Sequence, residues 1–90
     1  MQKRAVVTVV GKDQIGIIAK VTNVLANNRM NILDISQTIL QDFFTMMMLV
    51  DMANISDLDH LLQDFKKVEQ ELGLTINIQR EDVFQAMHRV

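Results

Sequence analysis

The chain has 90 residues, 49% of them hydrophobic, and nine basic against eleven acidic residues give it a net charge of −2 at pH 7. This length suits one domain, while the acidic balance and the lack of tyrosine and tryptophan argue against a nucleic-acid surface built on phosphate contacts and base stacking. The chain has no cysteine, which excludes disulfides, thiol nucleophiles and cysteine metal sites. No stretch is long enough to span a membrane, and the apolar run after Arg4 lacks a signal-peptide cleavage site. We therefore expect a cytoplasmic protein that contacts neither nucleic acid nor membrane.

A change of apolar period predicts the first two elements. Residues 5–10 form a nearly continuous apolar run rich in valine, which is typical of a central strand covered on both faces. After residues 11–16 the apolar side chains recur at helical spacing, at Ile17, Ile18, Val21, Val24 and Leu25. This spacing predicts a helix with one buried face. The helix should end near Asn27 and Asn28, because asparagine tolerates the left-handed conformation that closes a helix.

Residues 31–50 predict two further strands. Residues 31–40 mix apolar and polar side chains, as in a half-exposed edge strand, and a β-bulge would account for the slip in their alternation near Leu33 and Asp34. Gln41 and Asp42 form a short connection to residues 43–50, which are almost entirely apolar and predict a second central strand. The methionines at 46–48 could suggest a soft-metal site. Neighbours on a strand point to opposite faces, so we assign these methionines to packing instead.

The remaining residues predict a second helix, an edge strand and a short tail helix. Ser56, followed three residues later by Asp59, has the form of a capping box. Apolar residues keep one helical stripe from Leu58 to Leu72, and Gly73 stands where a C-terminal cap belongs. Residues 75–79 alternate and predict an edge strand. Beyond them, apolar residues at helical spacing suggest an amphipathic helix over residues 81–90 that must cover something: Val83, Phe84, Met87 and Val90.

The order strand, helix, strand, strand, helix, strand predicts an α+β fold. Right-handed crossovers on this unit give the split βαβ sandwich, in which a four-stranded antiparallel sheet carries both helices on one face. We expect one domain over residues 1–90, with its core at residues 4–80. The first and third strands are central in this topology, and they are the continuously apolar ones. The open face of the sheet should then be covered by the tail helix, by a partner subunit or by both, and we expect a homodimer.

The turn at residues 11–16 is the candidate functional site. Gly11 and Gly16 are two of the three glycines in the chain, and each marks a place where the backbone needs positive φ or room for a ligand. Asp13 can cap the following helix, which would leave the amide groups of Ile15, Gly16 and Ile17 pointing outward at the positive helix end. Such a turn can hold a small anion, although a capped corner without a ligand explains the same residues.

The chain resembles ACT domains, small regulatory modules that bind amino acids. The resemblance runs from about Val6 to Gln79, and it is most similar to stand-alone ACT proteins of bacteria and to the ACT domains of formyltetrahydrofolate deformylase and the glycine cleavage repressor. Its specific part comprises the segment VVGKDQIGIIA at residues 9–19, then Asn31, Ile32, Asp34, Ile35, Ser36 and Gln37, and then Asp42, Phe44, Met46 and Met47.

The resemblance implies a ferredoxin-like fold, a side-by-side dimer and an effector site between the first turn and the start of a neighbouring second strand. Gly11 matches the turn glycine, Asp13 the polar residue that meets the ligand's amino group or caps the helix, and Gly16 the glycine at the helix start. Asn31 matches a residue that reaches the ligand across the subunit boundary. Asp34, Ser36 and Gln37 are either further ligand contacts or the wet side of an edge strand. Many relatives have a basic residue and then proline where this chain has Gln14 and Ile15.

We therefore predict a non-catalytic, dimeric sensor that binds a small amino acid or a similar zwitterion at the subunit interface. The ligand carboxylate would bind the amides of Ile15, Gly16 and Ile17, its ammonium would meet Asp13, and Asn31 would orient it. The alternative is a ligand-free module that docks on a regulatory or metabolic protein.

An enzyme is the least favoured class, because acylphosphatases of this fold need an arginine beside the turn, where this chain offers only Lys12. His60 and His88 lie on different predicted helices, and solvated or packed histidines explain both, so we predict no metal and no cofactor.

Overall fold

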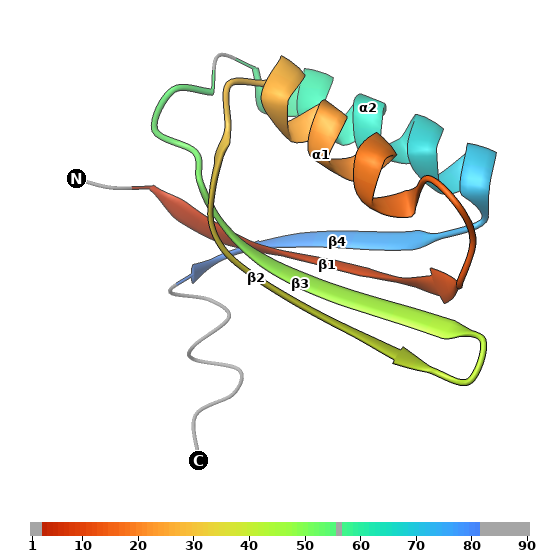
Figure 1. Ribbon diagram of the computed structural model, residues 1–90. Helices are drawn as coiled ribbons and strands as arrows, with labels where there is room; N and C mark the ends of the chain where they lie inside the picture. Colours follow the sequence, from red (N-terminus) through yellow and green to blue (C-terminus); the bar gives the residue numbers. More distant parts are fainter. Residues whose placement is uncertain (1–2, 56, 82–90) are drawn as a thin grey trace.

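The computed structural model describes residues 3–55 and 57–81, and it places two helices on one face of a four-stranded antiparallel sheet (Figure 1). This arrangement confirms the predicted α+β, ferredoxin-like βαββαβ sandwich. The predicted helix over residues 81–90 lies, apart from its first residue, outside the described residues. The elements are β1 (Arg4–Lys12), α1 (Ile17–Asn27), β2 (Asn31–Leu40), β3 (Phe43–Asp51), α2 (Leu58–Leu72) and β4 (Thr75–Arg80).

The strand order β2-β3-β1-β4 confirms that the two continuously apolar strands, β1 and β3, are central. Val9 of β1, for example, lies between Met46 of β3 and Ile76 of β4. The pairing of β2 with β3 shifts between Ile32 and Asp34, which confirms the bulge. Because side chains alternate along a strand, this shift decides which residues of β2 face the helices.

The core lies between the sheet and the helices. Val7, Val9, Met46 and Met48 are all at most 1% exposed, under a layer that includes Val21 of α1. Met47, between two buried methionines, points to the opposite face and is 37% exposed. The assignment of Met46 and Met48 to packing is therefore confirmed. Alternate residues of one strand supply both the core and the surface of the open face.

The helix ends differ from expectation in three places. Asp57, not Ser56, caps α2, because its carboxylate accepts hydrogen bonds from the amides of Asp59 and His60 at 3.0 and 3.3 Å. Ser56 itself lies outside the described residues. Gly16, not Asp13, is the N-cap of α1. Gly73 takes the left-handed conformation after α2, as predicted.

The end of α1 is the third difference. The helix stops at Asn27, as predicted, but the left-handed residue beyond it is Arg29, with φ of 59°, and not an asparagine. Asn28 keeps a negative φ, and its Nδ2 donates to the carbonyl oxygen of Val24 at 2.8 Å and to Asp64 of α2 at 3.0 Å. The buried amide thus closes α1 and joins the two helices.

Candidate functional site

Gly11, at the end of β1, makes room for the chain that follows α2. A Cβ atom at this position would lie 2.5 Å from Cδ2 of Leu74 and 3.4 Å from the carbonyl oxygen of Gly73. The backbone of Gly11 does not have positive φ, unlike that of Gly16. Glycine is therefore required at position 11 because Leu74 occupies the space that a Cβ atom would need, and not because a ligand approaches the backbone there.

The turn between β1 and α1 is held from two sides. The amide of Asp13 donates to the carbonyl oxygen of Asp42 at 2.7 Å, which ties the turn to the β2–β3 hairpin. On the other side, Nε2 of Gln14 donates to the carbonyl oxygen of Leu72 at 2.7 Å and to that of Lys12 at 3.2 Å. Gln14 thus satisfies a terminal carbonyl group of α2, which gives this departure from the family pattern a structural role.

The helix that follows begins without a cap. Gly16 is in the left-handed region with φ of 95°, and no side chain among the described residues caps α1. The first hydrogen bond of α1 runs from the amide of Lys20 to the carbonyl oxygen of Gly16, at 2.9 Å. The amides that precede this bond belong to Ile17, Ile18 and Ala19. Because the helix begins at Gly16, the free amides lie two residues further along the chain than a cap at Asp13 would place them.

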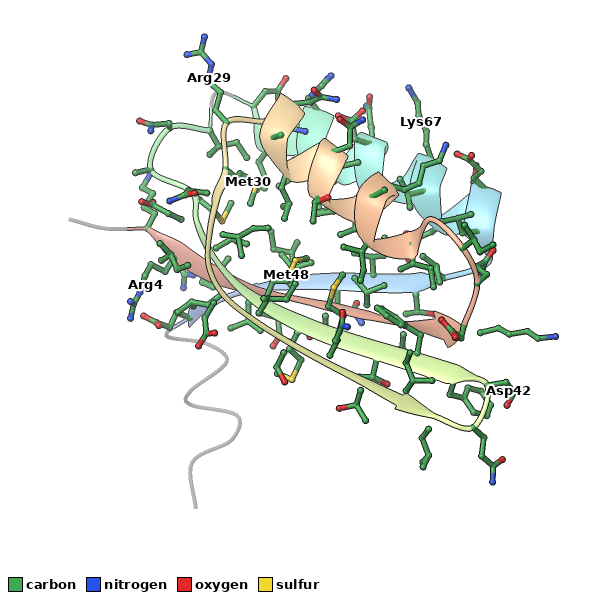
Figure 2. All side chains as sticks on the ribbon, viewed as in Figure 1. Arg4, Arg29, Met30, Asp42, Met48 and Lys67 are labelled. Atoms are coloured by element: carbon green, nitrogen blue, oxygen red, sulfur yellow. The ribbon has the colours of Figure 1, made fainter. Side chains whose placement is uncertain are left out.

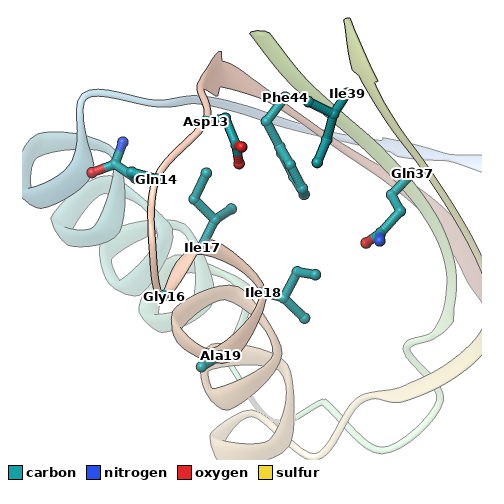
Figure 3. A pocket seen from close by; sticks show the side chains of 9 residues that line it. All are labelled: Asp13, Gln14, Gly16, Ile17, Ile18, Ala19, Gln37, Ile39 and Phe44. Carbon is teal, nitrogen blue, oxygen red and sulfur yellow. The ribbon is translucent and has the colours of Figure 1, made fainter. Parts of the chain in front are cut away.

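A cavity of about 250 Å³ opens beside this helix start (Figure 3). The carboxylate of Asp13 and the side-chain amide of Gln37 face the space between α1 and β2 from opposite sides, whereas Gln14 points away from it. Of the described residues that line the cavity, Asp13 is the only one that ionises. The lining residues are Asp13, Gln14, Gly16, Ile17, Ile18, Ala19, Gln37, Ile39 and Phe44.

The structure brings some of the predicted site residues together and separates others. Asp13, Gly16 and Ile17 line the cavity. Ile15 belongs to the same turn, but its side chain is 100% exposed and lies outside the lining. Asn31 pairs with Asp51 at the far end of β2, so only a second copy of the chain could bring an Asn31 side chain to this cavity.

Asp34 also lies away from the cavity, at the bulge of β2. Its Oδ1 accepts a hydrogen bond from the amide of Ile35 at 2.8 Å, which is the local role expected of a polar residue at a bulge. Asp34 lines instead a second hollow on the open face of the sheet. Within one chain, Asp34 is therefore a structural residue of the edge strand.

Gln37, Ile39 and Phe44 are the lining residues that the turn motif does not reveal. Ile39 pairs with Phe44, and Gln37 with Met46, which points into the core. The odd-numbered residues of this half of β2 therefore face the helices. The bulge sets this parity, so locating it in the sequence would have decided between the two roles left open for Gln37, ligand contact or exposed edge-strand residue.

Large apolar side chains are exposed at the end of the molecule where the first turn meets the β2–β3 hairpin. Ile39, which lines the cavity, is 53% exposed, whereas Leu40 and Phe43 point to the open face of the sheet and are 72% and 60% exposed. Together with Ile15 we call these residues the apolar rim, and such exposed clusters usually mark an interface. Among the described residues, neither helix is long and apolar enough to cross a membrane.

Comparisons with known proteins agree with this architecture. The profile described as ACT domain matches residues 3–79. A UPF0237 protein of the archaeon Methanococcus maripaludis is 51% identical over 89 residues, which cover 98% of this chain and 99% of the relative.

Solved structures extend the agreement to the fold. An ACT domain protein from Streptococcus pneumoniae is 41% identical with a TM-score of 0.78, over 94% of this chain and 97% of the other. A formyltetrahydrofolate deformylase from Pseudomonas syringae is 25% identical with a TM-score of 0.76, over 89% of this chain and 28% of the enzyme. The chain belongs to the ACT domain family.

Proposed function

We propose that this chain is a non-catalytic regulatory ACT domain that binds a small amino acid in the cavity beside α1. The observation that carries the proposal is the meeting of two opposite charges in one cavity. The uncapped start of α1 presents amide groups at the positive end of the helix dipole, and Asp13 presents a carboxylate to the same space. A zwitterion satisfies both groups at once.

The roles follow from the position of each group. The ligand carboxylate binds the amides of Ile17, Ile18 and Ala19, which replaces the earlier assignment to residues 15–17. The ammonium group binds Asp13, and the amide of Gln37 orients the molecule from β2. The remaining walls are apolar, at Ile39 and Phe44, so the cavity favours a neutral side chain.

The size of the cavity agrees with a small ligand. A volume of about 250 Å³ holds about eight water molecules at ~30 Å³ each. That space suits a molecule of roughly five to ten non-hydrogen atoms, which is the size range of the smaller amino acids.

A second copy completes the proposed site. β2 lies at the edge of the sheet, and Ile18, Ile35 and Ile39 beside it are each at least 40% exposed. Antiparallel pairing of two β2 edges would cover these side chains and extend the sheet. It would also place the start of one β2 beside the end of the other, so that Asn31 of the second copy approaches the cavity. Ligand and dimer then stabilise one another.

Thermal shift and calorimetry against the twenty amino acids test this proposal. A ligand present at 100 times its Kd raises the free energy of unfolding by about 2.7 kcal/mol, and Asp13→Asn should abolish the response. Asp42→Asn is the matched control, because Asp42 lies on the neighbouring hairpin and only its backbone carbonyl oxygen contacts the turn. If a folded dimer responds to none of the amino acids at millimolar concentration, the sensor proposal is wrong.

A ligand-free interaction module is the second candidate, and the apolar rim formed by Ile15, Ile39, Leu40 and Phe43 favours it. In that case a partner protein covers the rim. Affinity capture with wild type and with Ile15→Asp separates the candidates. Loss of a captured partner by this variant, in a chain that never responds to amino acids, supports the module.

A further inference from the structure

The sheet has two edge strands, β2 and β4, and they differ in length and composition (Figure 1). β2 has ten residues, whereas β4 has six and begins with the uncharged run TINI, which is rich in β-branched residues. A run of this kind pairs readily with another strand, so an open edge made of it invites association. A sheet that is open at both edges can add a copy at each. The groups that satisfy the edge of β4 therefore decide how copies of this chain can associate.

The backbone of Ile76 faces the outer edge of β4. Ile76 lies opposite Val9 of β1, but its amide donates to Oε2 of Glu69 on α2, at 2.9 Å. In an antiparallel pair, residues that bond across the ladder alternate with residues whose backbone groups point away from it. Ile78, two residues further on, therefore presents its amide to the same outer edge. Glu69 occupies the first outward donor of the strand.

The turn between α2 and β4 positions Glu69 for this contact. The backbone carbonyl oxygen of Glu69 accepts from the amide of Leu74 at 3.1 Å, where Gly73 takes the left-handed conformation that ends α2. The chain then returns as β4, and the half-buried side chain of Glu69 meets the amide of Ile76, seven residues later. Lys67, on the same helix, is exposed and points away from the sheet (Figure 2). Both the backbone and the side chain of Glu69 thus hold it beside β4.

A carboxylate in this position excludes an arriving strand. To pair with β4, a second strand would have to place a carbonyl oxygen where Oε2 of Glu69 already accepts the proton of Ile76. A hydrogen bond to a charged acceptor is stronger than one to a backbone carbonyl group. Displacing Glu69 would also leave a half-buried charge without its donor.

The edge of β2 has no comparable contact from a helix within the described part of the chain. Asp34 accepts from the amide of its neighbour Ile35 at 2.8 Å, at the bulge where β2 changes register. Beyond the bulge, no side chain among the described residues bonds to the backbone of residues 36–40. The two edges are therefore unlike: α2 closes β4, and most of β2 stays open.

We propose that Glu69 closes the β4 edge to strand addition and thereby directs self-association of this chain to the edge of β2. Copies that pair through β2 alone stop at two, whereas copies open at both edges would continue to add. The direction toward β2 rests on the dimer proposed above. The closure of β4 rests on the contact between Glu69 and Ile76 and stands without that dimer.

Glu69→Ala in the full-length chain tests the closure, with the mean mass measured by sedimentation over a range of protein concentrations. The variant lacks the acceptor of Ile76, so association through β4 should strengthen roughly tenfold or more, and the mean mass should exceed that of wild type. Glu71→Ala is the matched control, because it removes the same charge from the same helix, where Glu71 bonds to Lys20 of α1 at 2.7 Å. A folded Glu69→Ala variant with the mass of wild type overturns the proposal, and so does equal association of Glu71→Ala.

Amide hydrogen exchange shows where the variant associates. In Glu69→Ala the amide of Ile78 should become protected as the concentration rises, because a second β4 then accepts its proton. In wild type its exchange should not depend on concentration. Association of the variant without protection of Ile78, or concentration-dependent protection of Ile78 in wild type, contradicts the closure.

The same measurements separate this proposal from the dimer through β2. If wild type is a monomer, that dimer is wrong, but Glu69→Ala should still form dimers with Ile78 protected. If wild type is a dimer and the variant is no larger, the closure of β4 is wrong and the dimer through β2 stands.

Discussion

The fold contains two corners at which a central strand leads into a helix, and the two corners are built in opposite ways. After β3, the amide of Ala53 donates to Oδ1 of Asp51 at 2.9 Å, and Asp57 caps α2 with its own carboxylate. After β1, the turn bonds to the hairpin and to α2, and no side chain in the described part of the chain caps the start of α1. The corner between β3 and α2, which we call the second corner, satisfies its own polar groups. The corner between β1 and α1, the first corner, leaves helix amides available beside a cavity.

This difference between the corners supports the proposed position of the ligand. A helix start costs free energy when its amides lack partners, so a cap at each corner would be the more stable solution. Among the residues that the structure describes, a side chain caps α2 and none caps α1. The structure therefore leaves at α1 the hydrogen-bonding capacity that a small anion can use. Binding and stability compete for the same amide groups, and substitutions at the two corners can separate them.

The largest expected effect is at Gly11, which positions the first corner against the chain after α2. Gly11→Ala would bring a Cβ atom to 2.5 Å from Cδ2 of Leu74 and should lower the free energy of unfolding by about 2 kcal/mol through overpacking. Urea denaturation followed by circular dichroism measures it. The double variant Gly11→Ala/Leu74→Ala should lose less than the sum of the single variants. Strict additivity would show that Leu74 is not the cause.

Removing a carboxylate from each corner compares the corners directly. Asp57→Ala deletes the cap of α2 and should cost about 1 kcal/mol. Asp13→Ala deletes a carboxylate that caps no helix, so stability in the absence of ligand should change by less than about 0.5 kcal/mol. Thermal unfolding of both variants without amino acids measures the difference. Equal losses would mean that Asp13 caps α1 in solution and that the two corners are alike.

Much of the fold could be predicted because its signals are local and periodic. The continuous apolar runs of β1 and β3 predict central strands, and Gly73 predicts the end of α2, since each depends on neighbouring residues alone. The start of α1 could not be predicted in the same way. Asp13 resembles a cap in the sequence, but its amide is held by Asp42, a residue of a distant hairpin. That contact fixes the turn so that Gly16 begins the helix.

Which residues line the candidate site also depends on contacts between residues far apart in the sequence, here the pairing of β2 with β3. Asp13, Gly16 and Ile17 lie within one turn motif and were predicted from it. Gln37 and Ile39 reach the cavity only because the bulge between Ile32 and Asp34 turns the odd residues of β2 toward the helices. A strand register is set by pairing along its whole length, so a pattern of single residues does not reveal it.

The left-handed conformation of Gly16 is a further feature of the first corner that substitutions can test. Its φ of 95° suits glycine, and a Cβ atom there would meet nothing within 4 Å, so the cost of substitution is conformational. Gly16→Ala should cost about 1 kcal/mol. Gly16→Asn should cost less, because asparagine tolerates positive φ. Thermal unfolding of the two variants measures the order. A smaller loss for alanine would show that α1 starts elsewhere in solution.

The smallest expected effect is at Gln14, where the first corner is attached to α2. Gln14→Ala removes the hydrogen bond from Nε2 to the carbonyl oxygen of Leu72, which is 2.7 Å long and exposed. The loss should be about 0.5 kcal/mol, since water replaces the donor. Gln63→Ala, on an exposed part of α2, is the matched control and should change nothing measurable. Hydrogen exchange of the last turn of α2 locates the effect: its amides should exchange faster in Gln14→Ala alone. If the exchange is unchanged, Gln14 does not tie the first corner to α2, and the cavity wall at residues 13–16 is held by the contact of Asp13 with Asp42 alone.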